Sequence, residues 1–409
     1  MSRNKIIGAV EIGTSKVLVL VAELVDGKSL NLIGFGRKPS AGIKKGEIID
    51  FKYASRVTHA AIDEAEKSAG VNIDSIYLAL SGGHLGGSFN KGSAQVSSHD
   101  GRVVEQDTLR AIEDAKSKRL PDKRLYIHHI RNPFLLDKKS VKSPIGMQGE
   151  MLEVGFWSVH GDESTIGNYL HVVNGFGLEV DDMIISSICS GEAVVFPATK
   201  EMGALVVDIG RGTTDYALFR NGNIIRTGVV CVGGDHLTND LSMGLRISPK
   251  EAEELKKREG SLDAEKLVPG SKAKVMLRGD YTIGDREIPF QSIYKILQAR
   301  VEELFQIIKS DLGELLDTDD LAGRVVLTGG SSQLTGIDET AARVLGMQVE
   351  MGELPNWVDE SLRVPGNSTV LGLLRYASNH HNLNAVTSQN SGFLGKLRSI
   401  FKPKRLEVA

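Results

Sequence analysis

The sequence predicts an α/β protein in which two related lobes face each other across a cleft. Residues 6–21 read as an apolar strand with an acid near its end, a short Gly, Thr and Ser turn, and a second apolar strand. The same order recurs over residues 204–219, and a turn between two apolar runs is typical of a β-hairpin. A chain of 409 residues is long enough for two or more cores. The repeated hairpin therefore predicts two lobes of similar design.

Helical and strand patterns alternate along the rest of the chain. Residues 126–160 are richer in strand-forming residues and carry two prolines, which favours a small inserted subdomain. From residue 380 to 390 the chain turns polar and loses its periodicity, which is typical of a linker. Helices are predicted over 54–68, 106–119, 249–258 and 291–310, and short strands over 76–80 and 324–328.

Composition narrows the class of protein. Hydrophobic residues make up 41% of the chain and charged residues 25%, which is an ordinary globular balance. The net charge of −3 provides no overall positive field, so nucleic acid is not expected as a partner. Cys189 and Cys231 stand alone, which argues against structural zinc and indicates a reducing cytoplasm. The N-terminus has no signal-peptide pattern, and the apolar run at 17–22 is too short to cross a bilayer.

The turns of the two hairpins carry residue types that bind phosphate. Small residues let backbone N–H groups come close to phosphate oxygens. The acids before the turns, Glu11 and Asp208, can orient a hydrated Mg²⁺. One such turn occurs in any β-rich protein and is most simply structural. Two of them, with a third turn at Gly329 and Gly330, indicate nucleotide binding.

Together these segments resemble the phosphate-1, phosphate-2 and adenosine motifs of the actin, Hsp70 and sugar-kinase superfamily. The resemblance implies duplicated ribonuclease-H-like lobes around a cleft for ATP and Mg²⁺, with the metal held through water by Glu11 and Asp208. Glu253 and Lys256 share a face of what looks like the ribose-side helix, a pattern that a solvated surface helix would also show. The residues implied to bind the nucleotide are Glu11, Gly13, Thr14, Ser15, Lys16, Asp208, Gly210, Arg211, Gly212, Thr213, Thr214, Gly233, Glu253, Lys256, Gly329 and Gly330.

Four further segments, 40–46, 80–84, 143–154 and 233–240, resemble the FtsA family of bacterial division proteins, and the Pro-Ile-Gly-Met stretch at 144–147 is the most diagnostic. The resemblance runs from about residue 5 to 402. It implies binding to the C-terminal tail of FtsZ, self-association into actin-like filaments and recruitment of later division proteins. It also implies a peripheral place on the cytoplasmic face of the inner membrane at the division site.

The same resemblance implies an actin-like fold in which a subdomain called 1C is inserted and the usual subdomain 1B is missing. FtsZ would bind to subdomain 2B, and filament contacts would involve 1C. Subdomain 1A would take residues 1–82, 166–205 and 346–379, 1C residues 83–165, 2A residues 206–235 and 301–345, and 2B residues 236–300, followed by a linker at 380–391 and an amphipathic helix at 392–405.

Two departures from the family pattern affect what we expect of ATP binding and hydrolysis. Arg211 stands where the second phosphate turn normally has Gly, and a non-Gly residue is strained there if φ is positive. Since a guanidinium is also a good oxyanion partner, we expect ATP binding to be retained with altered geometry. Relatives such as MreB carry a water-positioning Glu where residues 182–187 here offer serines, and an unaided serine is a poor base. Hydrolysis is therefore expected to be slow or absent.

The C-terminal residues predict a membrane-binding helix. Bulky apolar residues at helical spacing form one stripe, and cations without a neighbouring acid lie between them. This pattern suits the surface of an anionic bilayer, where each cation contributes about 1 kcal/mol. A helix that docks on the protein's own body or on a partner is the alternative, which the polar linker and the cationic excess disfavour. The predicted membrane contacts are Phe393, Leu394, Lys396, Leu397, Arg398, Ile400, Phe401 and Lys402.

Three other classes share parts of this pattern. A small-molecule kinase needs a catalytic Asp base, for which the sequence has no signature. An Hsp70-like chaperone needs a peptide-binding domain after the nucleotide domain. A PilM-like adaptor of type IV pilus assembly shares the fold and the insertion but lacks, as a rule, the cationic C-terminal helix, so the tail favours the division protein.

Overall fold

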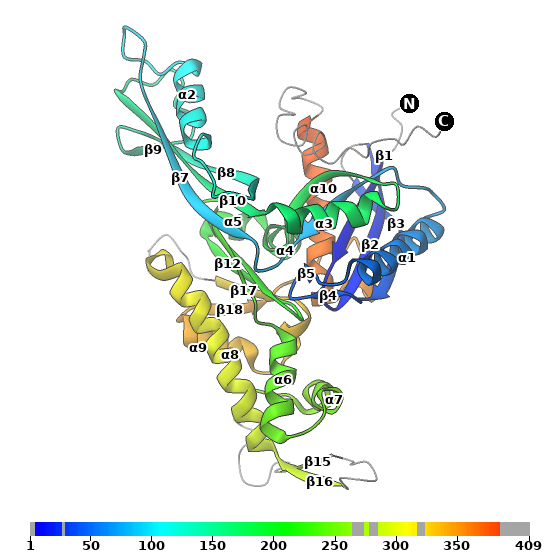
Figure 1. Ribbon diagram of the computed structural model, residues 1–409. Helices are drawn as coiled ribbons and strands as arrows, with labels where there is room; N and C mark the ends of the chain where they lie inside the picture. The colour runs from blue at the N-terminus through cyan, green and yellow to red at the C-terminus, as the bar shows by residue number, and fades with distance from the viewer. Residues whose placement is uncertain (1–4, 27–28, 264–273, 278–284, 317–323, 385–409) are drawn as a thin grey trace, which may run out of the picture.

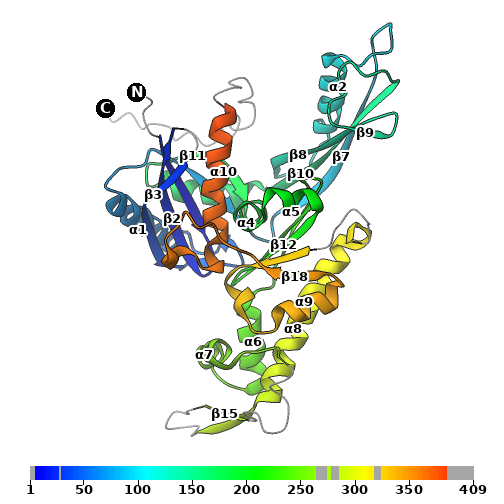
Figure 2. The same ribbon diagram turned by 180° about the vertical axis from the view of Figure 1, so that it is seen from behind.

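The computed structural model describes residues 5–26, 29–263, 274–277, 285–316 and 324–384. Two lobes lie side by side, and a third, smaller body projects from them (Figures 1 and 2). The predicted membrane helix at 392–405 lies outside the described residues. No helix in the described ranges is long and apolar enough to cross a membrane.

The first lobe is a sheet with the strand order β11-β6-β1-β2-β3. Every residue from Val17 to Ala22 in β2 is buried, because α1 and α10 cover the sheet on its two faces (Figures 1 and 2). Helix α1 begins where the Asp50 side chain accepts a hydrogen bond from the amide of Tyr53 at 3.1 Å. The elements are β1 (Lys5–Ile12), β2 (Lys16–Val25), β3 (Ser29–Pro39), β4 (Ile43–Lys44), β5 (Glu47–Ile48), α1 (Phe51–Ala69), β6 (Ser75–Leu80), α3 (Glu163–Asn174), β11 (Glu179–Ile185), α4 (Ser186–Val194) and α10 (Ser368–Asn384).

The second lobe repeats this design, with the order β18-β17-β12-β13-β14. In both sheets an antiparallel hairpin stands at the centre, and a parallel strand pairs with its first arm. The predicted duplication is therefore confirmed. The elements of the second lobe are β12 (Ala204–Ile209), β13 (Thr214–Arg220), β14 (Asn223–Val230), α6 (Gly234–Leu245), α7 (Pro249–Glu259), β15 (Lys274–Leu277), β16 (Arg286–Pro289), α8 (Phe290–Leu312), η2 (Gly313–Leu316), β17 (Arg324–Thr328), η3 (Gly330–Gln333), α9 (Ile337–Leu345) and β18 (Gln348–Met351). The short helix α5 (Pro197–Met202) precedes the lobe, and η4 (Glu360–Leu362) and η5 (Pro365–Asn367) follow it.

The projecting body is the predicted insertion. The chain leaves the first lobe after β6 and returns to it at α3, and between these points it forms a sheet in the order β7-β10-β8-β9 under one helix. This sheet has a small apolar core of its own. We call this body the inserted domain. It consists of β7 (Gly86–Gln95), α2 (Glu105–Lys116), β8 (Arg124–Leu136), β9 (Lys139–Val141) and β10 (Met151–Asp162).

The structure corrects four of the predicted boundaries. The second lobe begins at Ala204 rather than 206, where β12 starts, and it runs to Met351 rather than 345, because β18 pairs with β17. The division at 300 falls inside α8, which is one continuous helix. The predicted linker at 380–391 begins too early, since α10 continues to Asn384. Residues 373–384 contain no Gly or Pro that would end the helix.

Candidate functional site

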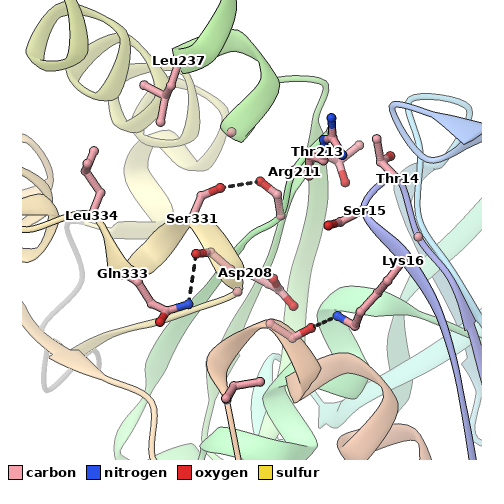
Figure 3. A pocket seen from close by; sticks show the side chains of 18 of the residues that line it. Thr14, Ser15, Lys16, Asp208, Arg211, Thr213, Leu237, Ser331, Gln333 and Leu334 are labelled. Carbon is pink, nitrogen blue, oxygen red and sulfur yellow. Dashed lines mark hydrogen bonds between the residues drawn. The ribbon is translucent and has the colours of Figure 1, made fainter. Parts of the chain in front are cut away.

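A cavity of about 1000 Å³ opens between the two lobes, and both hairpin turns line it. Figure 3 shows Thr14 and Ser15 from the first lobe facing Thr213 and Arg211 from the second. The turns come very close at Gly212, where an added Cβ would lie 2.5 Å from Thr14 Oγ1 and 2.9 Å from the Cα atom of Lys45. Glycine is needed here for space, because a side chain would push the two lobes apart.

Most of the predicted nucleotide residues meet in this cavity. Two of them do not line it. The Thr214 side chain is buried and its hydroxyl donates to the carbonyl of Val232 at 2.8 Å, while Gly233 precedes α6 and its neighbour Gly234 lines the wall instead. The predicted residues that line the cavity are Glu11, Gly13, Thr14, Ser15, Lys16, Asp208, Gly210, Arg211, Gly212, Thr213, Glu253, Lys256, Gly329 and Gly330.

The two turns have the same backbone geometry. The amide of Gly13 donates to the carbonyl of Lys16 at 3.0 Å, and the amide of Gly210 donates to the carbonyl of Thr213 at 2.9 Å. Within each closed turn, the amides of residues 14–15 and 211–212 donate to no other group in the part of the chain that the structure describes. Free amides in a turn form a concave anion site. The cavity therefore has two such sites on opposite walls.

Two buried carboxyl groups lie beside these turns. Burial raises the pKa of Asp208, although the hydroxyls of Ser190, Ser368 and Thr369 donate to it. Burial also raises the pKa of Glu11, whose Oε2 atom has no hydrogen-bond partner. A hydrated cation would satisfy that oxygen and hold both groups ionised.

This arrangement fits Mg²⁺ bound through water. Among the described residues no group of three or more His, Cys, Asp or Glu side chains is placed to hold a metal ion by itself. Mg²⁺ commonly keeps several waters and takes one or two carboxylates together with phosphate oxygens. Glu11 and Asp208 supply that minimal set, and the Coulomb repulsion that raises the pKa of Glu11 comes in part from Asp208.

Glu253 and Lys256, which were predicted to lie beside the ribose, are on α7. That helix begins with Pro249 and a reciprocal cap, in which the amide of Glu251 donates to the Ser248 hydroxyl and the amide of Ser248 donates to the Glu251 carboxylate. Lys256 Nζ donates to Thr238 Oγ1 at 2.7 Å and pairs with Glu253 at 2.6 Å. The Lys256 side chain is only 13% exposed, so a freely solvated helix face is ruled out for it.

The charges of this pair are stabilised by their contacts. Burial on its own would raise the pKa of Glu253, but hydrogen bonds from Lys256 and Thr238 outweigh it and lower the pKa to about 2. The Lys256 ammonium also donates to the carbonyl of Gly234 at 2.8 Å. An ionised carboxylate fixed in this way is a suitable acceptor for hydroxyl groups of a sugar.

Arg211 is accommodated without backbone strain. Its φ angle is not positive, so the cost expected for a non-Gly residue at this place does not arise. The guanidinium turns towards α6, where Nε donates to Asp235 Oδ1 at 2.7 Å. Figure 3 shows its side chain next to Thr213, apart from Asp208. The hydrogen bond from Arg211 to Asp235 also raises the pKa of the guanidinium.

Sequence reasoning missed Asp215 as a site residue. This carboxyl group lines the cavity and lies 2.8 Å from Ser81 Oγ in the other lobe. Burial is the main cause that raises its pKa to about 7, and the nearby Asp208 adds to it. In the second hairpin an acid, Asp215, occupies the position that Leu18 occupies in the first hairpin. This difference between the two hairpins could have identified Asp215 as a site residue.

The serines at 182–187 are not arranged as a base. Ser186 lines the cavity, but its hydroxyl donates to the carbonyl of Leu80 at 3.1 Å. The hydroxyl of Ser187 is buried without a hydrogen-bond partner. Ser331 lines the cavity next to the predicted turn at Gly329 and Gly330. Other lining residues were not marked by any local pattern: Arg37, Gln333, Asn367 and Thr369.

Two lobes of matching topology around a cavity with paired phosphate turns define the actin-like class of proteins. Solved structures agree with this fold. The chain aligns with the PilM–PilN type IV pilus biogenesis complex with a TM-score of 0.62 and 16% identity, covering 91% of this chain and 98% of that one. With ADP-bound MreB5 of Spiroplasma citri the TM-score is 0.54 and the identity 16%, over 92% and 98% of the two chains.

The chain belongs to the FtsA family. The family model for cell division protein FtsA matches residues 205–372, and the model for the SHS2 domain inserted in FtsA matches residues 82–160. The chain is 34% identical to FtsA of Pseudomonas aeruginosa over 91% of its own length and 89% of that protein. It is 32% identical to FtsA of Bacillus subtilis and 30% identical to that of Escherichia coli, over 92% of this chain and 84% and 91% of those proteins. The likeness to PilM is one of fold alone.

Proposed function

We propose that this division protein is an ATP-binding, self-assembling adaptor that tethers the FtsZ ring to the cytoplasmic membrane and helps to recruit later division proteins. The ATP-binding part rests on one observation above all. Two turns with the same closing hydrogen bond face each other across the cavity, and among the described residues the amides of 14–15 and 211–212 have no acceptor. A triphosphate between them would be held from both lobes.

In this proposal both lobes contribute contacts to the nucleotide. The first turn and Lys16 hold phosphate oxygens from one side, and the second turn holds them from the other. Glu11 and Asp208 hold Mg²⁺ through water, and the ion would neutralise phosphate charge. Glu253 and Lys256 take the ribose, and the turn at 329–330 lies under the nucleoside. Hydrolysis is slow or absent, because the Ser186 hydroxyl is engaged by Leu80.

ATP binding would favour the closed arrangement of the lobes, since a ligand shifts an equilibrium towards the state that it binds better. One fixed arrangement then allows copies to assemble through the inserted domain, while the FtsZ tail binds to the second lobe at about 236–300. A membrane helix of about three turns is marginal alone. Filaments raise its effective concentration, and avidity gains of about 10²–10⁴ are typical.

Co-sedimentation with anionic liposomes tests the proposal. The full chain is compared with a variant that ends at Asn390, each with and without Mg-ATP. We expect only the full chain to pellet with liposomes, and more of it with ATP. A peptide of the FtsZ C-terminal tail is the control ligand, which both variants should bind equally. Equal pelleting of the two variants would contradict membrane attachment by the tail. If Mg-ATP did not increase the pelleting of the full chain, nucleotide-dependent assembly would be contradicted.

A further inference from the structure

The inserted domain is connected to the first lobe only, but it packs against both lobes. Ile127, Trp157 and Val159 of the inserted domain lie in the apolar core of the first lobe. Both of its connections run to the first lobe, through β6 and α3. Its strands β7, β8 and β10 also pack along β14, which is the edge strand of the second sheet. An edge strand covered in this way is protected from pairing with other chains. The contact also links the lobes outside the cavity.

Trp157 in β10 is the centre of this contact. It is 2% exposed, and its indole Nε1–H donates to the hydroxyl of Thr227 in β14 at 2.9 Å. The indole lies against Gly87 in β7, where an added Cβ would be 2.0 Å from the ring. A buried indole that finds a partner in another lobe combines a large apolar contact with a directional bond.

In the second lobe, a network of polar and charged side chains supports the residues that contact Trp157. The guanidinium of Arg226 lies 4.8 Å from the centroid of the Trp157 ring. The same group pairs with Asp311 on α8 at 2.9 Å, and the hydroxyl of Tyr216 in β13 donates to Asp311 as well. Three elements of the second lobe, β13, β14 and α8, therefore meet at the tryptophan of the inserted domain.

The contact occurs together with the closed arrangement of the lobes. Tyr216 follows Asp215, whose carboxylate lines the cavity and contacts Ser81 in the first lobe. In the same structure Gly212 of the second turn lies against Thr14 of the first. A rotation that opened the turns would also move β14 relative to the inserted domain. The Trp157 contact and closure of the cavity are thus geometrically coupled.

We propose that the contact between Trp157, Thr227 and Arg226 is a clamp that stabilises the closed lobes and so strengthens ATP binding at a distance. The inference rests on the proposed binding of ATP in the cavity. Because coupling between two sites is reciprocal, bound ATP strengthens the docking of the inserted domain in turn. Occupancy of the cavity then sets the position of the domain through which copies of the chain are proposed to assemble.

The clamp predicts an effect of Thr227 on ATP affinity, although Thr227 does not line the cavity. Thr227→Val keeps the shape and removes the acceptor, and we expect it to weaken ATP binding by about fivefold in calorimetry. Arg226→Gln, at a partly exposed residue, is expected to act in the same direction and is less disturbing to the fold. Thr340→Val is the matched control, since Thr340 is a buried threonine of α9 outside both the cavity and the clamp.

Fluorescence reports the reciprocal effect. In a Trp357→Phe background Trp157 is the only tryptophan, because the chain has two. We expect Mg-ATP to lower the quenching of Trp157 by acrylamide, and Thr227→Val to remove this protection. Unchanged quenching together with an unchanged ATP affinity in both clamp variants would overturn the clamp and leave ATP binding standing. Failure of the unmodified chain to bind ATP would overturn the proposed function and the clamp together.

Discussion

The hydroxyl of Ser81 lies 2.8 Å from both carboxylate oxygens of Asp215, and this hydrogen bond joins the two lobes in the wall of the cavity. Ser81 follows β6 in the first lobe, at the point where the chain leaves for the inserted domain. Asp215 belongs to β13 of the second lobe and also accepts from Thr213 at 3.0 Å. The pair therefore connects the phosphate turn of one lobe with the exit strand of the other.

The first prediction concerns pH. Burial raises the pKa of Asp215 from 3.8 to about 7. Between these values the folded protein keeps a proton that the unfolded chain has lost, so this group stabilises the fold at low pH and the effect is lost as the pH rises through about 7. In this pH range, Asp215 contributes up to about 1.4 kcal/mol per pH unit to the slope of the free energy of unfolding against pH.

Urea denaturation at several pH values between 3.8 and about 7 measures this slope. Asp215→Asn keeps the contact with Ser81 and does not ionise, so its stability should fall less steeply with rising pH. Asp122→Asn, at an exposed residue away from the cavity, is the control and should keep the original slope. An unchanged slope in Asp215→Asn would show that the carboxyl group is not held neutral by burial.

The second prediction concerns the approach of the two turns. Gly212→Ala places a methyl group 2.5 Å from Thr14 Oγ1 and forces the turns apart, so ATP should bind about tenfold more weakly. Gly330→Ala is the matched control, because Gly330 lines the same cavity but has no atom within 4 Å of an added Cβ. Calorimetric titration with Mg-ATP compares the two. Equal affinities would mean that the turns do not act together on one ligand.

The third prediction tests the metal ligand. Glu11→Gln removes the charge that we propose to orient hydrated Mg²⁺, and outer-sphere ligands of this kind are typically worth about tenfold or more in metal affinity. Mg-ATP should therefore bind more weakly, whereas ATP in EDTA should bind as before. The EDTA arm is the internal control for the fold of the site. If both forms of ATP lost affinity equally, Glu11 would be acting on the nucleotide or on the fold instead of the metal.

The fourth prediction concerns Arg211. Since Asp235 engages the guanidinium, Arg211→Gly should retain ATP binding and change stability by no more than about 1 kcal/mol, as for other exposed ion pairs. Asp235→Asn leaves the guanidinium unpaired at the edge of an anion site, so ATP affinity should rise. Titrations of both variants with ATP, together with urea denaturation, measure these effects. Abolished ATP binding in Arg211→Gly would instead assign the phosphate contact to this side chain.

The sequence predicted the local elements of secondary structure. The hairpins, their turns and the long helices α1 and α8 depend on contacts between near neighbours, and their periodicity and turn residues are written in short windows. The likeness of the two hairpins also predicted the duplicated lobes, and the family resemblance predicted the insertion, which the shared strand order and the domain match confirm.

Contacts between residues far apart in the sequence were shown only by the tertiary structure. Thr214 is adjacent to Thr213 in the sequence, yet it turns into the second lobe towards Val232 because successive side chains of a strand point to opposite faces. The sequence motifs contained Ser81, Arg211, Asp215 and Asp235, but they did not show that Ser81 contacts Asp215 or that Arg211 contacts Asp235.

The sequence by itself determined which segments form the Gly and Thr turns, because the backbone conformation of a turn depends on the residues in it. Only the tertiary structure decided that these turns meet at Gly212 and Thr14, which carboxyl groups lose their water, and that Trp157 spans to Thr227. Burial and contacts of this kind depend on how whole lobes pack, and short windows of sequence do not encode them.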